Sequence, residues 1–227
     1  GGETSGTANM VRVEEIVFDD SDDDGDTDDG GNGLVSIRTA YIQDSGTGKR
    51  DTKYKYSVKG YPIVTINATA PHTVSAHDNL GRVTATAYYS SSSGLSATSN
   101  PVTLATNRLA LNETVFDNRG QVWKTIRHKI DAADGSDDDT LDSQSWFDAE
   151  GRVIKRDGEQ LEKLAYDRLG RQTHHFVLGA IDTTERDTPT YAAADDVSGD
   201  FVLEERQTTY DTDGTVNDQG AYGGPNG

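Results

Sequence analysis

The sequence contains no cysteine and a single methionine among its 227 residues. The lack of cysteine excludes disulfides, thiolate metal sites and cysteine nucleophiles. No apolar run approaches the length of about eighteen residues that a membrane-spanning helix needs, so no membrane span is predicted. Hydrophobic residues make up only 33% of the chain and the mean hydropathy is -0.71. This content is lower than in typical globular domains.

Basic residues are also scarce, with 21 Lys and Arg against 39 Asp and Glu and a net charge of -18. Because phosphate binding needs a basic face, we expect no nucleic acid partner. The chain does contain strand-like runs such as "RVTATAYY" and "QVWKTIRHKI", rich in alternating β-branched and aromatic residues. A wide sheet with solvent-exposed faces explains both the low hydrophobic content and the strand-like runs, since alternation buries only every second residue.

A six-residue pattern recurs along the sequence: an aromatic residue, Asp, two variable residues, Gly and Arg. Good copies occupy residues 77–82, 147–152 and 166–171, weaker ones lie at 116–121 and 210–215, and degenerate ones at 56–61 and from Val17. The residues that define the five clearer copies are His77, Asp78, Gly81, Arg82, Phe116, Asp117, Gly120, Phe147, Asp148, Gly151, Arg152, Tyr166, Asp167, Gly170, Arg171, Tyr210, Asp211 and Gly214. Such a repeat indicates a fold built from repeated structural units, so the rest of the sequence is interpreted within that architecture.

The local chemistry of this repeat predicts a tight turn between two strands. Asp at the first turn position can accept hydrogen bonds from backbone amides two residues on, and Gly at the fourth supplies the positive φ of a bulged hairpin loop. The aromatic residue and the Arg flank the turn, so we expect a cross-strand cation–π contact of about 0.5–1 kcal/mol between them. Each unit is therefore predicted to be one β-hairpin.

These units resemble the RHS or YD-repeat family, which is named for Tyr-Asp-x-x-Gly-Arg units of about twenty residues. The resemblance extends through the weaker copies over most of residues 17–216. It implies an all-β fold in which antiparallel β-hairpins spiral into a β-sheet shell or tube, with little helix. It also implies a large secreted or cell-surface protein, used as a toxin-enclosing cocoon or in adhesion, whose repeats carry no catalytic residues.

The spacing divides the chain into three parts. Residues 1–16 are predicted to be a Gly-rich joint and lead-in strand, residues 17–216 the hairpin array, and residues 217–227 a second Gly-rich joint. A short helical turn is expected around residues 191–197. Some intervals between motifs approach two periods, with turn-rich segments at 43–46, 96–101 and 187–189 near their midpoints. Either hairpins with a degraded motif or inserted loops fill these intervals, and we expect hairpins in at least two of the three.

Two acidic runs interrupt the array, at residues 19–29 and 131–142. In the first, alternate carboxylates fit the first half of a calcium loop, with Gly25 at the sharp turn. The five predicted calcium ligands are Asp20, Asp22, Asp24, Asp26 and Asp28. However, Gly31 replaces the Glu expected at the twelfth position, so a solvated acidic loop remains the alternative interpretation. The second run lacks the required Gly and is predicted to be a solvated loop.

No other group of residues predicts a catalytic or cofactor site. His174 and His175 are adjacent on a predicted strand, so they point to opposite faces and cannot easily share a metal. His77 occupies the aromatic position of a repeat and is expected to pack there. No nucleophile elbow or phosphate-binding Gly loop occurs, so we expect neither an enzyme nor an organic cofactor. Surface glycan on the serines at 90–93 is a further hypothesis.

Three functional hypotheses follow. The first is a non-catalytic structural repeat unit of a large extracellular or cell-surface tube, shell or fibre, from a bacterial source. Its Gly-rich ends suggest that neighbouring copies or repeats join head to tail. The second is part of a toxin-enclosing RHS cocoon, although the Asp-Pro cleavage dipeptide usual in that class is absent. The third is a calcium-dependent adhesion or glycan-binding module.

Overall fold

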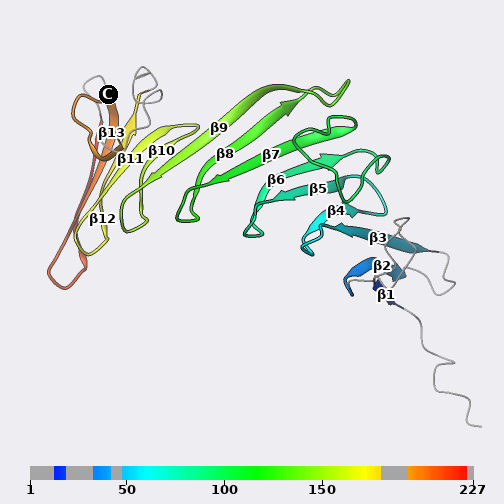
Figure 1. The fold of residues 1–227 in the computed structure, drawn as a ribbon. Coiled ribbons are helices and arrows are strands. Elements are labelled where there is room, and N and C mark those ends of the chain that lie inside the picture. Colours follow the sequence, from blue (N-terminus) through cyan, green and yellow to red (C-terminus); the bar gives the residue numbers. More distant parts are fainter. Residues whose placement is uncertain (1–12, 19–32, 42–47, 180–193, 224–227) are drawn as a thin grey trace, which may run out of the picture. The chain divides into compact units, whose positions relative to one another are not determined.

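A computed structural model describes residues 13–18, 33–41, 48–179 and 194–223, which contain fourteen strands in one antiparallel sheet. The strand order in the sheet is the order along the chain, so each strand lies beside its sequence neighbours (Figure 1). The strands are β1 (Glu14–Phe18), β2 (Val35–Tyr41), β3 (Lys49–Tyr56), β4 (Pro62–Ile66), β5 (His72–His77), β6 (Val83–Tyr89), β7 (Arg108–Phe116), β8 (Val122–Ile130), β9 (Asp137–Phe147), β10 (Val153–Asp157), β11 (Leu161–Tyr166), β12 (Gln172–Leu178), β13 (Val202–Tyr210) and β14 (Val216–Gly223). The prediction of an all-β hairpin array is confirmed.

Helix is scarce, as the sequence predicts. Ala194 and Asp195 are the only helical residues in the described part of the chain, and they fall within the expected helical turn at 191–197. Nowhere in the described ranges does a helix have the length and apolar character needed to cross a membrane.

The strands divide into two compact units, and the division runs through β7, β8 and β9. The first unit comprises residues up to Glu113 together with His128–Thr140, and the second comprises Thr114–Arg127 and the residues from Leu141. Each unit has its own buried face, because β-branched and small apolar residues alternate with polar ones along the strands.

The core of the first unit is a row of apolar side chains that runs across four strands. Val64 on β4 faces Val74 on β5, Val74 faces Ala87 on β6, and Ala87 faces Leu111 on β7. All four residues are at most 1% exposed, and they form one cluster with Ala85, Tyr89 and Leu95. Cross-strand neighbours of this kind are the basic contribution to sheet stability.

Arg108 fixes two loops of the first unit against each other. Its side chain is buried, and it donates hydrogen bonds to the carbonyl oxygens of Pro101 and Val102, both at 3.1 Å, and of Gly135 at 3.0 Å. The loop between β6 and β7 is therefore tied to the turn between β8 and β9. A Cβ atom on Gly135 would lie 2.0 Å from the Ala105 carbonyl oxygen, so only glycine fits this close approach.

One of the long intervals between motifs contains an inserted loop, which joins β6 to β7. β6 pairs directly with β7, β12 with β13 and β2 with β3, so no additional strand lies between them in the sheet. The expectation of degraded hairpins is wrong for residues 96–101, which lie in the loop between β6 and β7. Residues 43–46 and 187–189 lie outside the described residues. Chain length alone does not distinguish a hairpin from a loop of the same length.

Two predicted boundaries also need correction. Residues 217–223 form most of β14, where a Gly-rich joint is predicted, because Gly220 and Gly223 pair in register with Gln207 and Glu204 of β13. The second acidic run is a loop only at its start, where a short turn follows β8. From Asp137 onward the run belongs to β9, where its carboxylates project from a strand.

Candidate functional site: the repeated turns

Six copies of the motif form the same turn. In each copy the fifth residue, a Gly, donates a backbone hydrogen bond to the carbonyl of the second, at 2.8–3.1 Å. The backbone amide of the second residue donates to the carbonyl of the sixth, at 2.8–3.0 Å. The six glycines are Gly60, Gly81, Gly120, Gly151, Gly170 and Gly214, and their φ angles lie between 79° and 90°. This is the positive φ that the sequence predicts.

The motif Asp closes the turn from inside, as the copy at Asp167 shows. Its Oδ1 atom accepts hydrogen bonds from the backbone amides of Leu169 and Arg171, both at 2.9 Å, and its Oδ2 atom accepts one from Arg171 Nε at 2.7 Å. The same pairing of Asp with Arg occurs at Arg82 and Arg152. The Asp side chain therefore stabilises the backbone of its own turn.

Hydrogen bonding within the turn lowers the pKa of these carboxyl groups. At Asp167 the backbone amide of Arg171 makes the largest contribution, and it outweighs the opposing desolvation. The pKa is also lowered at Asp78, where desolvation is the largest single effect and raises it, but hydrogen bonds from Arg82 and Leu80 together outweigh it. Hydrogen bonds that require the charged form lower a carboxyl pKa in this way.

Two of the motif arginines contact the aromatic ring of the following repeat. The Arg152 guanidinium lies 4.8 Å from the ring centroid of Tyr166, and that of Arg171 lies 4.3 Å from the ring of Tyr210. The expected cation–π contact thus exists but joins successive turns, and its predicted placement within one hairpin is wrong. The Arg is held by the Asp of its own turn, which turns the guanidinium toward the next hairpin.

The aromatic hydroxyl strengthens the same junction. Tyr166 donates to the Val153 carbonyl and Tyr210 to the Gln172 carbonyl, each at 2.9 Å. In both cases the acceptor directly follows the Arg of the preceding turn. Tyr56 makes a similar bond of 2.8 Å to the carbonyl of Val35.

Copies that depart from the consensus contact the next turn in other ways. Tyr61 occupies the Arg position of its copy and stacks on His77 of the next, with centroids 5.3 Å apart, so His77 packs as expected. Gln121 occupies the same position and donates to the Gly151 carbonyl at 3.0 Å. Arg119, in a variable position, donates to the Asp148 carbonyl at 2.8 Å. In these two copies a link to the next turn is present although other residues form it.

The other predicted site residues are not brought together. Asp20, Asp22, Asp24, Asp26 and Asp28 lie outside the described residues. Across the ranges that the structure describes, no cluster of three metal-ligating residues occurs. His174 stacks on Phe176 and lies 3.7 Å from Glu205, whereas His175 lies 3.4 Å from Glu162, so the two histidines have separate partners.

Three polar residues with largely buried side chains were not predicted. His128 lies between two carboxylates, with Nε2 2.7 Å from Glu113 and Nδ1 2.8 Å from Asp137. Lys155 and Lys163 face each other in register on β10 and β11 and are buried. No sequence signal identifies them, because lysine in an alternating strand normally indicates the solvent face.

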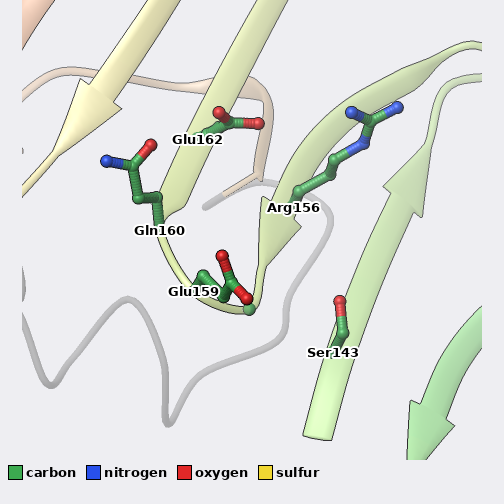
Figure 2. A pocket seen from close by; sticks show the side chains of 6 residues that line it. Ser143, Arg156, Glu159, Gln160 and Glu162 are labelled. Carbon is green, nitrogen blue, oxygen red and sulfur yellow. The ribbon is translucent and has the colours of Figure 1, made fainter.

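A polar hollow of about 620 Å³ lies near the turn between β10 and β11. Figure 2 shows Glu159 and Gln160 at this turn, with Arg156 and Glu162 on the flanking strands and Ser143 on β9. The described lining residues include two carboxylates, one guanidinium and one hydroxyl, but no histidine or lysine.

No protein-family model and no curated protein matches the sequence. Among solved structures, a crystal structure of TcdB2-TccC3-Cdc42 is similar, with 13% identity and a TM-score of 0.31 over 82% of this chain and 14% of that chain. A Photorhabdus luminescens Tc holotoxin pore is similar with 14% identity and a TM-score of 0.35, over 84% of this chain and 12% of that one. The chain therefore spans only 12–14% of the length of these two structures.

Proposed function

We propose that this chain is a non-catalytic structural segment of a large extracellular β-rich tube, shell or fibre of the YD-repeat type. One observation carries the proposal: the motif residues bind the next turn. Arg152 and Arg171 each form an ion pair with the Asp of their own turn and a cation–π contact with the aromatic ring of the next turn. A repeat array requires such contacts, because each unit is stabilised mainly by its interfaces with the neighbouring units.

The side-chain chemistry supports a role without catalysis. The lowered carboxyl pKa values belong to turn residues whose oxygens are occupied by amides and a guanidinium. A carboxylate saturated in this way stabilises backbone and is poorly suited to accept a proton from a substrate. Neither an organic cofactor nor a catalytic metal forms part of the proposal.

The proposed partners are neighbouring copies or repeats, joined head to tail through the outer strands. β1 and β14 are the first and last strands in the sheet order, and both carry exposed apolar residues. Phe18 on β1 is 52% exposed, and Val216 and Tyr222 on β14 are 58% and 53% exposed. Outer strands of this kind readily pair with another chain.

Electron microscopy of the purified chain and of a tandem dimer of it tests this function. We expect filaments of uniform width with an axial repeat, longer for the tandem form. Tyr222→Lys should shorten them, because a charge on an outer strand opposes pairing between edges. A matched change away from the outer strands, Leu169→Lys in an exposed turn, should leave the filaments unchanged.

Discrete hollow particles of fixed size would favour the cocoon instead. Monodisperse single copies at high concentration, unaffected by Tyr222→Lys, would contradict the proposed assembly.

A further inference from the structure

Lys163 and Asp200 form an ion pair that is almost completely removed from solvent. Lys163 Nζ lies 2.7 Å from Asp200 Oδ2, and the two side chains are 2% and 4% exposed. Lys163 is on β11, whereas Asp200 lies just before β13 and is separated from it by 37 residues along the chain. The pair therefore holds the residues just before β13 against the sheet.

The surroundings of this pair combine apolar side chains with Lys155, the buried register partner of Lys163 on β10. Leu161 and Leu178 are buried and face each other in register, and Phe176 is the register partner of Lys163. A second contact fixes the ammonium, because Nζ also donates to the Asp196 carbonyl at 2.5 Å. The nitrogen is thus held against one carboxyl group with little freedom to move.

Burial makes the charged form of this pair costly. Taking an ammonium and a carboxylate out of water carries a large desolvation penalty that their attraction only partly offsets. An amide is neutral and keeps one N–H donor, for which the Asp196 carbonyl is already in place. Removal of both charges is therefore favoured at this position in a way that it is not at an exposed ion pair.

We propose that Lys163 and Asp200 condense to an intramolecular isopeptide bond. Proton transfer from the ammonium to the carboxylate gives a neutral amine and a carboxylic acid. The amine lone pair attacks Cγ of Asp200 and forms the C–N bond. The C–OH bond then breaks, the departing hydroxyl takes a proton from nitrogen, and one water molecule leaves. No oxidant, metal or external group is consumed.

The proposed bond would give this chain a covalent cross-link that it cannot obtain otherwise, since it contains no cysteine. It would close the loop from β11 to the start of β13 and so restrict the unfolded chain. The link lies within the second unit and does not depend on assembly with neighbouring copies.

Intact mass spectrometry of the purified full chain under denaturing conditions tests the proposal. We expect a mass below that of the sequence by one water molecule. Tryptic digestion should then yield a branched species in which residues 157–168 are joined to residues 187–206, because acylated Lys163 resists cleavage. A chain with the full sequence mass and only linear peptides would overturn the proposal.

Two substitutions separate the cross-link from other losses of water, such as succinimide formation at Asp-Gly. Lys163→Arg keeps a buried cation but removes the nucleophile, and it should restore the full sequence mass. Lys129→Arg changes a lysine whose side chain is 73% exposed, and it should leave the loss of water intact. Persistence of the loss in Lys163→Arg would place it elsewhere and overturn the assignment. The wild-type measurement decides the question even if Lys163→Arg folds poorly.

Discussion

At the scale of single residues, the motif glycines carry the strictest requirement. Gly170 has a φ of 81°, a conformation that β-branched residues adopt only with strain. Gly170→Val should therefore lower the free energy of unfolding by about 1–2 kcal/mol or more. Denaturant unfolding followed by circular dichroism measures this change.

A matched control is Gly223→Val on β14, where no positive φ occurs and a Cβ atom meets nothing within 4 Å. This control should be close to neutral. Equal effects at the two glycines would contradict the turn geometry.

The motif aspartates make the stability of the folded protein depend on pH in the acid range. Because the pKa of Asp167 is lower in the folded chain than in the unfolded one, the unfolded chain binds the proton more tightly. The stabilisation is fully present above the unfolded value of about 4 and is lost as the pH falls through the folded value. Asp167→Asn should thus destabilise the protein at neutral pH, and the difference from wild type should shrink on acidification.

Thermal unfolding of both forms from neutral pH down into the acid range measures this trend. The deficit of Gly60→Val, whose turn carries Ser57 at the position of the motif Asp, should change much less over the same range. A constant deficit for Asp167→Asn would show that its carboxyl charge contributes nothing.

How far the sequence predicts single residues depends on whether their roles are local. Asp and Gly act within one turn, so their geometry could be predicted from six residues. The partner of Arg152 could not, because it depends on which hairpin lies beside the turn. Burial of Lys155 and Lys163 was also unpredictable, since the connection before β13 covers one of them only after the chain has folded.

At the scale of the elements, successive hairpins are coupled through the motif. A double-mutant cycle on Arg171→Ala and Tyr210→Leu should give a coupling free energy of about 0.5–1 kcal/mol. The same cycle on Arg171 and Tyr166, the aromatic residue of its own turn, should give a value near zero. Similar couplings in the two cycles would contradict the link between neighbouring turns.

The acidic run between β1 and β2 provides a second prediction for an element. If Asp20, Asp22, Asp24 and Asp26 bind calcium, millimolar calcium should raise the melting temperature, because a ligand that binds only the folded state stabilises it. Chelation should reverse the shift.

Asp22→Ala should remove most of the shift, whereas Asp138→Ala in the second acidic run should preserve it. No response to calcium would leave the solvated-loop interpretation in place.

The elements also show why the sequence predicts strands better than boundaries. Alternation identified the strands, but the Gly-rich composition of residues 217–223 suggested a joint. Pairing with β13 provides backbone hydrogen bonds to every second residue there, and this tertiary effect overrides the low strand propensity of glycine.

At the scale of the whole molecule, neighbour-to-neighbour pairing predicts that stability is local. Each strand bonds only to its neighbours in the chain, so a defect should loosen nearby strands first. In native-state hydrogen exchange, Gly214→Val should accelerate the amides of β13 and β14 and leave those of β4, β5 and β6 nearly unchanged. Uniform acceleration in all strands would show a single cooperative unit.

One regularity of the connections has a practical consequence. Every motif turn links an odd-numbered strand to the next even-numbered one, whereas the long connections before β7 and β13 follow even-numbered strands. In an antiparallel sheet these two sets leave the strands at opposite ends. A foreign peptide or a small reporter domain grafted at the exposed residues Ser93 and Gly94, between β6 and β7, should therefore leave the motif turns unaltered. Insertions should therefore be tolerated better at this end of the strands than at the end that carries the motif turns.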